Sequence, residues 1–425
     1  MQVSLLSLLI ILLCYGTDVS SAWNWNGTLK TKIQTDNRYT RYVDDARVFG
    51  EIWGSFEAFD NNSWLISTDF VSRESLEDGF EGDIYQLYAE KKLANWNSKV
   101  KAGRFQRADS LGYYSLDGAS WQYKMPEKGL NFEVYGGKPL RQEDVRSVSG
   151  DWLYGFELYS LQQLNWKNKV LPIDSWGLRF GFQQFHDEQT STRLSLGNTI
   201  DGHFNQDWLH AYEFSFMSTL ETETGVFEEL LTSLSIDITE ARRVRISYAL
   251  YEPKLVYPTF KERFYSAYYQ GRQDLLSMSF NHDVGSTYSY HAGWKRAARN
   301  TEHDIGYGFD MGMQSQYFAD WRLSADFDML EFGKSSSYNL YFSGEYSLNI
   351  NSLLTLNLAY SLDDSILYAK NKAAGTEIKY RYKVQRHVFL DIASSYIVNS
   401  RLNDEYLVGV QLTWYFDNFQ PKVKM

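Results

Sequence analysis

The chain has 425 residues, of which 17% are aromatic, and it contains six prolines, a single cysteine and a formal net charge of −11. A negative balance of this size argues against a nucleic-acid-binding protein, because such proteins present basic surfaces to the phosphate backbone. The mean hydropathy of −0.43 argues against a bundle of membrane-spanning helices. Many aromatic residues and few prolines favour a protein built of strands, because proline removes a hydrogen bond from a β-ladder.

The first residues predict an exported protein. An apolar run at residues 5–13 is too short to span a bilayer as a helix, and small residues follow it up to Ala22. This pattern predicts a signal peptide at residues 1–22, with a retained N-terminal anchor as the alternative. Cleavage after Ala22 removes Cys14, so the mature chain has no disulfide. It therefore needs another stabilising device, such as the closure of a barrel in lipid.

The rest of the chain repeatedly shows the alternation of a β-strand, in which successive side chains point to opposite faces. Apolar or aromatic residues occupy every second position, and polar, small or charged residues lie between them. These segments recur about every 15–25 residues, which is the spacing of antiparallel strands joined by turns. No linker, low-complexity run or clear internal repeat interrupts residues 23–416, so one closed sheet is favoured over several sandwich domains. The clearest segments are residues 176–182, 244–250, 321–329, 354–360 and 377–384.

The connections between the segments alternate in length, as they do in barrels that cross a membrane. Short connections are predicted at residues 60–62, 95–97, 126–129 and around Glu240, and long ones at 35–45, 105–114, 138–151, 253–262 and 363–375.

The tight turn at residues 349–351 breaks this alternation, which indicates one strand too many or too few between Asp274 and Asn339. The raw count is about 23 strands. Because single-chain barrels of this class have even strand numbers, we expect about 22 strands, with 18–24 as the range.

The last strand, residues 407–416, carries a resemblance to a known family. Val408, Val410, Leu412, Trp414 and Phe416 form one apolar face. A glycine at 409 followed by the apolar residues 412 and 414 resembles the C-terminal signal strand of Gram-negative outer-membrane β-barrels of the porin-like superfamily, with no subfamily identified. The resemblance implies an all-β, closed antiparallel transmembrane β-barrel at residues 23–416, followed by a short tail at 417–425.

The resemblance also implies a place and a function. The barrel would lie in the bacterial outer membrane with both termini in the periplasm, in contact with outer-membrane lipid and inserted by the barrel-assembly machinery. The leading interpretation is a porin-like channel for passive diffusion of small polar solutes, and no enzyme. The alternative is a sheath that encloses a partner, such as a periplasmic or extracellular multihaem cytochrome in an electron conduit. A barrel-borne hydrolase and a soluble secreted β-propeller are weaker alternatives.

The polar members of each alternation are the candidate pore-lining residues. They carry both signs of charge, so they predict no clear preference for anions or cations, and the alternative is that they are simply solvated or paired. They are Arg179, Arg245, Arg322, Asp326, Glu345, Lys379, Arg381 and Lys383.

Residues 105–114 supply two further candidates. The flanking segments Gly103-Arg104-Phe105 and Leu116-Asp117-Gly118 resemble porin chains in which a loop folds into the pore, so Arg104 and Arg107 would line a constriction. The alternative is an exposed loop.

No motif for a cofactor or for catalysis is present. None of the seven histidines stands at a metal-binding spacing, although His203 and His210 straddle one connection with Asp201 and Asp207. A single cysteine excludes a C-x-x-C-H haem attachment site, and neither a nucleophile elbow nor a phosphate loop occurs. We therefore expect no cofactor and no metal.

Overall fold

The computed structural model describes residues 23–417 with some gaps. The predicted signal peptide, most of the short tail and the predicted long connection at 253–262 lie outside the described residues. The stretches that are not described are 1–22, 37–46, 61–62, 76–78, 110, 144–145, 150–151, 167–170, 187–189, 207–208, 252–272, 300–303, 317–319, 334, 366–367, 400–403 and 418–425.

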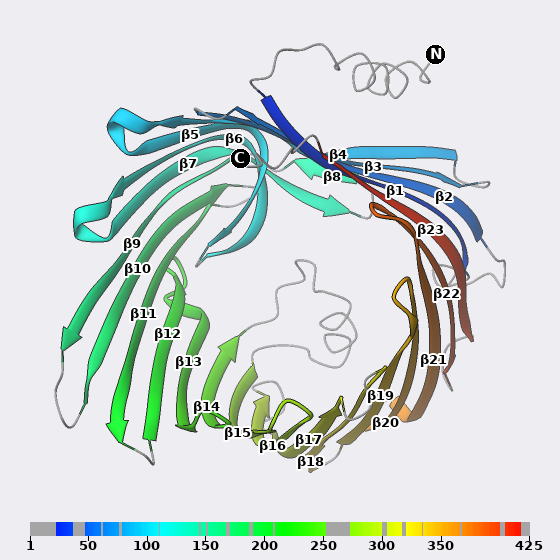
Figure 1. The fold of residues 1–425 in the computed structure, drawn as a ribbon. Coiled ribbons are helices and arrows are strands. Elements are labelled where there is room, and N and C mark those ends of the chain that lie inside the picture. The colour runs from blue at the N-terminus through cyan, green and yellow to red at the C-terminus, as the bar shows by residue number, and fades with distance from the viewer. Residues whose placement is uncertain are drawn as a thin grey trace, which may run out of the picture.

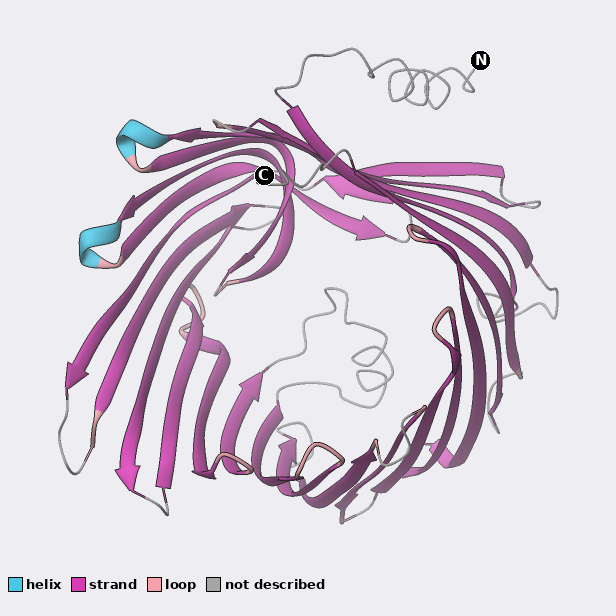
Figure 2. Cartoon of the chain, viewed as in Figure 1, coloured by secondary structure: helices cyan, strands magenta, loops and turns pink. Residues whose placement is uncertain are grey.

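The described residues form strands almost throughout, with two single-turn 3₁₀ helices, η2 (Ala94–Trp96) and η3 (Pro126–Lys128), at tight connections (Figure 2). Within this part of the chain, no helix is long and apolar enough to cross a bilayer. The strands are β1 (Trp23–Asp36), β2 (Arg47–Asp60), β3 (Trp64–Ser75), β4 (Gly79–Leu93), β5 (Ser98–Asp109), β6 (Gly112–Met125), β7 (Leu130–Glu143), β8 (Arg146–Ser149), β9 (Trp152–Trp166), β10 (Ile173–His186), β11 (Thr190–Gln206), β12 (Leu209–Glu221), β13 (Val226–Thr239), β14 (Arg242–Tyr251), β15 (Gln273–Val284), β16 (Tyr288–Arg299), β17 (Asp304–Ser315), β18 (Trp321–Phe332), β19 (Ser335–Asn349), β20 (Ser352–Ser365), β21 (Tyr368–Gln385), β22 (Val388–Asn399) and β23 (Glu405–Asp417).

These strands close into one antiparallel barrel (Figure 1). Each wall strand pairs with the next in sequence, and β1 pairs with β23 from Asn26↔Asp417 to Asp36↔Leu407, which completes the ring. The short strand β8 pairs with the end of β7, while β9 takes the neighbouring place in the wall. The wall therefore has 22 strands, and the predicted closed antiparallel β-barrel is confirmed.

Some predictions about the connections were wrong. The turn between β19 and β20 lies at the same end of the barrel as the chain termini and the short connections predicted at 60–62, 95–97, 126–129 and around Glu240. The alternation is therefore kept, and no strand is missing or superfluous between Asp274 and Asn339. The structure has 23 strands within the described residues, and the short β8, which lies in the predicted long connection at 138–151, is the one that is not part of the 22-strand wall. The predicted long connection at 363–375 is instead strand, because β20 continues to Ser365 and β21 starts at Tyr368. The predicted loop at 105–114 is formed mainly by the ends of β5 and β6.

The β5–β6 hairpin leaves the wall partway along its length. Pairing between β4 and β5 ends at Leu87↔Arg104, whereas β5 and β6 stay paired as far as Asp109↔Gly112. Figure 1 shows this end of the hairpin bending into the barrel, while β8 lies beside β4. Phe105 on this end belongs to a buried cluster that packs against the walls formed by β7 and β9. We call the part of β5 and β6 beyond Arg104 the inner hairpin.

A row of glycines lies where the inner hairpin bends. Gly103 pairs with Gly118, and Gly118 pairs with Gly137 on the next strand. The φ of Gly103 is +120°, a value that L side chains rarely adopt. A Cβ on Gly118 would lie 2.1 Å from the backbone oxygen of Gly136. Only glycine allows these three strands to approach and bend in this way, as expected where a sheet turns a sharp corner.

The inner hairpin identifies the two faces of the wall. Arg107 on the inner hairpin reaches Glu133 and Glu157, so these carboxylates lie on the inner face. Phe156 directly precedes Glu157 on β9, so its side chain points to the outer face. There its ring centroid lies 6.1 Å from that of Phe132 on β7. Residues that are paired in an antiparallel ladder share a face, so the pairing of each strand with the next extends this assignment around the barrel. On β23 it assigns Val410, which is 44% exposed, to the outer face.

The outer face is therefore apolar and the inner face polar, and a pair of neighbouring substitutions tests this assignment. Leu356 lies on the outer face, and Asn357 lies on the inner face beside Ser343 and Glu377. Leu356→Arg should cost about 2–4 kcal/mol near the bilayer midplane, whereas Asn357→Arg should be tolerated because its charge stays in water. The measurement is the denaturant midpoint of the folded barrel in lipid vesicles. Equal damage from both substitutions would contradict the assignment.

Candidate pore constriction

A buried arginine fixes the inner hairpin to the wall. Arg107 is 8% exposed. One terminal nitrogen of its guanidinium lies 2.6 Å from Glu133 Oε1, and the other lies 3.1 Å from Glu157 Oε2. The guanidinium also lies 3.9 Å from the ring centroid of Tyr135, which adds a cation–π contact. A cation held between two carboxylates and an aromatic ring thus connects the inner hairpin to the wall.

Apolar packing supports the same contact. Phe105 and Leu116 are a cross-strand pair of the hairpin and are 2% and 0% exposed. They form one cluster with Tyr135 of β7 and Leu153 of β9, and Phe185 of β10 packs against its edge. Burying side chains of this size stabilises by about 1.5–3 kcal/mol each, so the inner hairpin is a packed part of the barrel.

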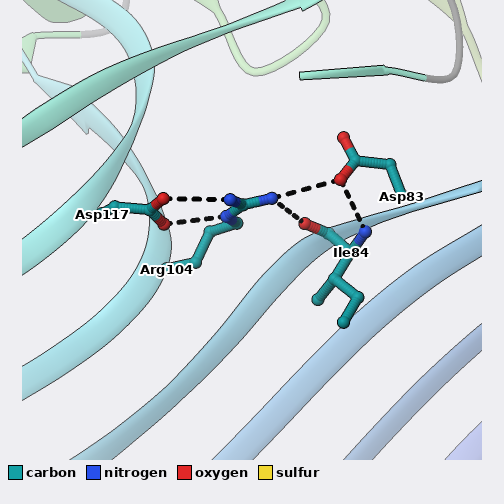
Figure 3. Close-up of polar contacts among 4 residues, drawn as sticks. All are labelled: Asp83, Ile84, Arg104 and Asp117. Atoms are coloured by element: carbon teal, nitrogen blue, oxygen red, sulfur yellow. Dashed lines mark hydrogen bonds and ion pairs between the residues drawn. The ribbon is translucent and has the colours of Figure 1, made fainter. Parts of the chain in front are cut away.

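A second arginine closes the gap that the hairpin leaves behind. Arg104 donates from Nε and Nη2 to the two oxygens of Asp117, at 2.8 and 2.9 Å. Its Nη1 donates to Asp83 Oδ1 at 3.1 Å and to the backbone oxygen of Ile84 at 2.8 Å (Figure 3). Ile84 lies in the part of β4 beyond its pairing with β5. The guanidinium therefore joins β6 to β4 where the ladder is interrupted, with the bidentate geometry that arginine favours on a carboxylate.

The predicted residues Arg104, Arg107 and Arg179 lie close to this region but in different surroundings. Arg107 is buried between the inner hairpin, to which it belongs, and the wall, and the side chain of Arg104 is one quarter exposed where β5 separates from β4. Arg179 is 42% exposed on the inner face, with its Nε 3.0 Å from Glu157. The structure thus brings Arg107 and Arg179 together on one carboxylate, a contact that the sequence did not predict.

The other predicted residues lie on the inner face, further along the wall. Most of them contact a neighbouring polar residue, which reduces the charge that each presents to the interior. Four of them are at ion-pair distance: Arg322 lies 3.4 Å from Glu345, Asp326 lies 3.6 Å from His291, Lys379 lies 2.8 Å from Glu377, and Arg381 lies 2.6 Å from Asp391. Arg245 lies 3.5 Å from the hydroxyl of Ser233. Lys383 stands opposite Phe389 in the ladder between β21 and β22.

Sequence reasoning missed the acidic partners of the constriction. Glu133 and Glu157 occupy inward positions of β7 and β9, and each faces the other across the ladder. Two carboxylates directly opposite one another repel, so a cation between them could have been expected if the register had been known. Asp83 carries no local signal, because it becomes relevant only when β5 leaves β4.

The described residues offer no metal site. They contain no group of three or more histidine, cysteine or acidic side chains arranged to hold an ion. His203 and His210 are close, with ring centroids 6.3 Å apart, and His203 Nδ1 lies 2.6 Å from Asp174 Oδ2.

Comparisons with known proteins find similarity in structure alone. No protein-family model matches the chain, and no curated protein matches it. Among solved structures, the chain is similar to OccAB3 of Acinetobacter baumannii, with a TM-score of 0.46, 8% identity and coverage of 93% of this chain and 99% of that one. It is also similar to OccK2 (OpdF) of Pseudomonas aeruginosa in complex with glucuronate, with a TM-score of 0.46, 7% identity and coverage of 93% and 97%. The P pilus usher (PapC) translocation pore gives a TM-score of 0.41, 8% identity and coverage of 94% and 100%. Likeness at this level does not bear on function.

Proposed function

We propose that the protein is a porin-like channel of the bacterial outer membrane through which small polar solutes diffuse passively. The observation that supports this best is the inner hairpin. It narrows the interior of a closed barrel whose outer face is apolar and whose inner face is charged. A 22-strand barrel is wide enough to need an internal obstruction if it is to select solutes by size. If the inner hairpin served only to stabilise the barrel, the inner face would not need charged residues on so many strands. A water-filled channel accounts for them.

The same proposal covers location and orientation. Residues 1–22 direct export, and the barrel-assembly machinery inserts the mature chain. The connections after β1 and after β14 are the two longest in the sequence, and both join strand ends opposite the termini. Outer-membrane barrels have short periplasmic turns and longer outer loops, so the position of these two connections supports our proposal that both termini lie in the periplasm.

The first test of the proposal is fractionation. The protein should be recovered with outer membranes and should migrate differently on gels before and after heating, because a closed barrel resists detergent until it is heated. Recovery as a soluble periplasmic protein in the absence of detergent would overturn the proposal.

The second test is conduction and its selectivity. Purified protein in planar bilayers should give stepwise ionic currents. Lys379, Arg381 and Lys383 lie about 6.5–7 Å apart along β21. Replacing all three with glutamine leaves Glu377 and Asp391 without their basic partners. The reversal potential in a salt gradient should therefore shift toward cations, most clearly at low salt, where the screening length is longer.

The control for this test is the wild-type current at high salt, where the difference between the two proteins should shrink. If the pore conducts and the triple variant has the same reversal potential as the wild type, these three residues do not line the conduction path. A barrel that gives no steps, and whose triple variant instead loses a co-purifying protein, would favour the sheath. The inner hairpin occupies part of the space that an enclosed partner would need, so it does not support the sheath.

A further inference from the structure

The wall beside the inner hairpin contains a hollow of about 190 Å³ that opens to the interior. It is formed by β6, β7, β9 and β10, and its polar lining residues include Gln122, Lys124, Asn131 and Tyr159. This volume is below the range of about 300–1,000 Å³ that is usual for drug-sized ligands. It suits a solute of the size of a single sugar or amino acid.

Two cross-strand rows build the hollow. In the first row Lys124 pairs with Asn131, Asn131 with Tyr159, and Tyr159 with Arg179. In this row a cation stands at each end and two neutral hydrogen-bonding side chains lie between them. Neighbouring strands are about 4.8 Å apart, so the two cations are roughly 14 Å apart at the backbone and their long side chains can reach inward.

The second row carries the negative charge of the hollow. Gln122 pairs with Glu133, and Glu133 pairs with Glu157. Both carboxylates already contact Arg107 of the inner hairpin, at 2.6 and 3.1 Å. The inner hairpin thus compensates half of the negative charge of this row, because one guanidinium lies between two carboxylates.

The positive charge of the first row is compensated only in part, at Arg179. Arg179 uses its Nε for Glu157 and lies 5.3 Å from the ring centroid of Tyr159. Lys124 is exposed, and within the described part of the chain no carboxylate lies at ion-pair distance from its ammonium group. With Arg107 included, three cations stand against two carboxylates, so the hollow carries an excess of one positive charge.

We propose that this hollow is a binding site for a small solute that has one anionic group and a neutral body rich in hydroxyl or amide groups. The anionic group binds Arg179 or Lys124, and the neutral body lies over Asn131 and Tyr159. Charge-assisted hydrogen bonds to a guanidinium or an ammonium are the strong ones, so the anionic group sets the affinity. This proposal rests on the proposed channel function and adds to it the class of solute that binds inside the channel.

The test compares gluconate with sorbitol, which has a similar carbon chain and hydroxyl groups but no charge. Detergent-solubilised protein is titrated with each by calorimetry, and the same solutes are added to the protein in planar bilayers. Gluconate should bind about tenfold more tightly than sorbitol and should reduce the ionic current. The double variant Lys124→Gln/Arg179→Gln should weaken gluconate binding by about tenfold or more and leave sorbitol unchanged.

Arg243→Gln provides the matched control, because Arg243 lies on the inner face outside the hollow, where it pairs with Asp237 at 2.5 Å. The affinity of this variant for gluconate should stay within about twofold of that of the wild type, although the substitution also removes one arginine charge from the inner face. The site is refuted if gluconate fails to bind, if the double variant binds it normally, or if Arg243→Gln weakens it equally. Calorimetry needs no conduction, so a protein that binds gluconate without passing current would overturn the proposed channel and not the site.

Discussion

Replacing Arg107 by methionine should release the inner hairpin from the wall and raise the conductance of the barrel. Methionine keeps most of the length and the apolar contacts of the side chain, but it leaves Glu133 and Glu157 facing each other without the cation between them. Removing one partner of a buried ion pair costs about 3–5 kcal/mol. That loss is concentrated on one contact between hairpin and wall, so the hairpin should move while the 22-strand wall remains closed. Single-channel conductance in planar bilayers provides the measurement.

The control for this prediction is Arg243→Met. The Arg243 side chain is 57% exposed and pairs with Asp237, so its loss should cost less than about 1 kcal/mol. Its conductance should stay close to that of the wild type. If Arg107→Met also leaves the conductance unchanged, either Phe105 and Leu116 alone hold the inner hairpin in place, or the hairpin does not limit the current.

Replacing Gly118 by valine should prevent the barrel from folding. A Cβ at this position lies 2.1 Å from the backbone oxygen of Gly136 and 2.7 Å from the Cα of Gly137. Both contacts involve backbone atoms, so no side-chain rotation relieves them. The ladder between β6 and β7 must open at the pair Gly118↔Gly137, and the bend of the inner hairpin is lost with it. The folded, heat-modifiable form should nearly disappear from outer-membrane fractions.

Gly50→Val is the matched control, because it makes the same substitution in another wall strand. A Cβ at Gly50 meets no atom within 4 Å, and valine is favoured in strands. This variant should fold as well as the wild type. Similar yields of folded Gly118→Val and Gly50→Val would show that the glycine row is not required for the bend.

The barrel could be predicted from the sequence because its cause is local. The alternation at residues 407–416 and 354–360 follows from the apolar outer face and the polar inner face of the wall, and it does not depend on distant residues. The same reasoning failed at 363–375, which it predicts to be a long connection. There β20 and β21 continue, because a pair of strands already held in register can extend beyond its apolar segment as Ser361↔Ala373 and Asp363↔Asn371 do.

The constriction could be predicted only in part. The segments that flank 105–114 were a local signal, because their resemblance to porin chains predicted that this part of the chain folds into the pore. The partners of Arg107 were not predictable, because Glu157 is 50 positions away in the sequence and meets it only through the folded hairpin. Contacts of this kind depend on register and on the direction in which a hairpin bends, and neither leaves a pattern in the sequence.

The ladder between β1 and β23 also has a consequence for the order of folding. Every other ladder in the wall joins strands that are close in sequence, whereas this seam joins Leu29 to Trp414. Contacts between distant residues require the costliest loop closure, so the seam forms late. Until it forms, both edge strands present unpaired backbone N–H and C=O groups to any passing strand. The newly made chain therefore needs both edge strands shielded until its two ends pair.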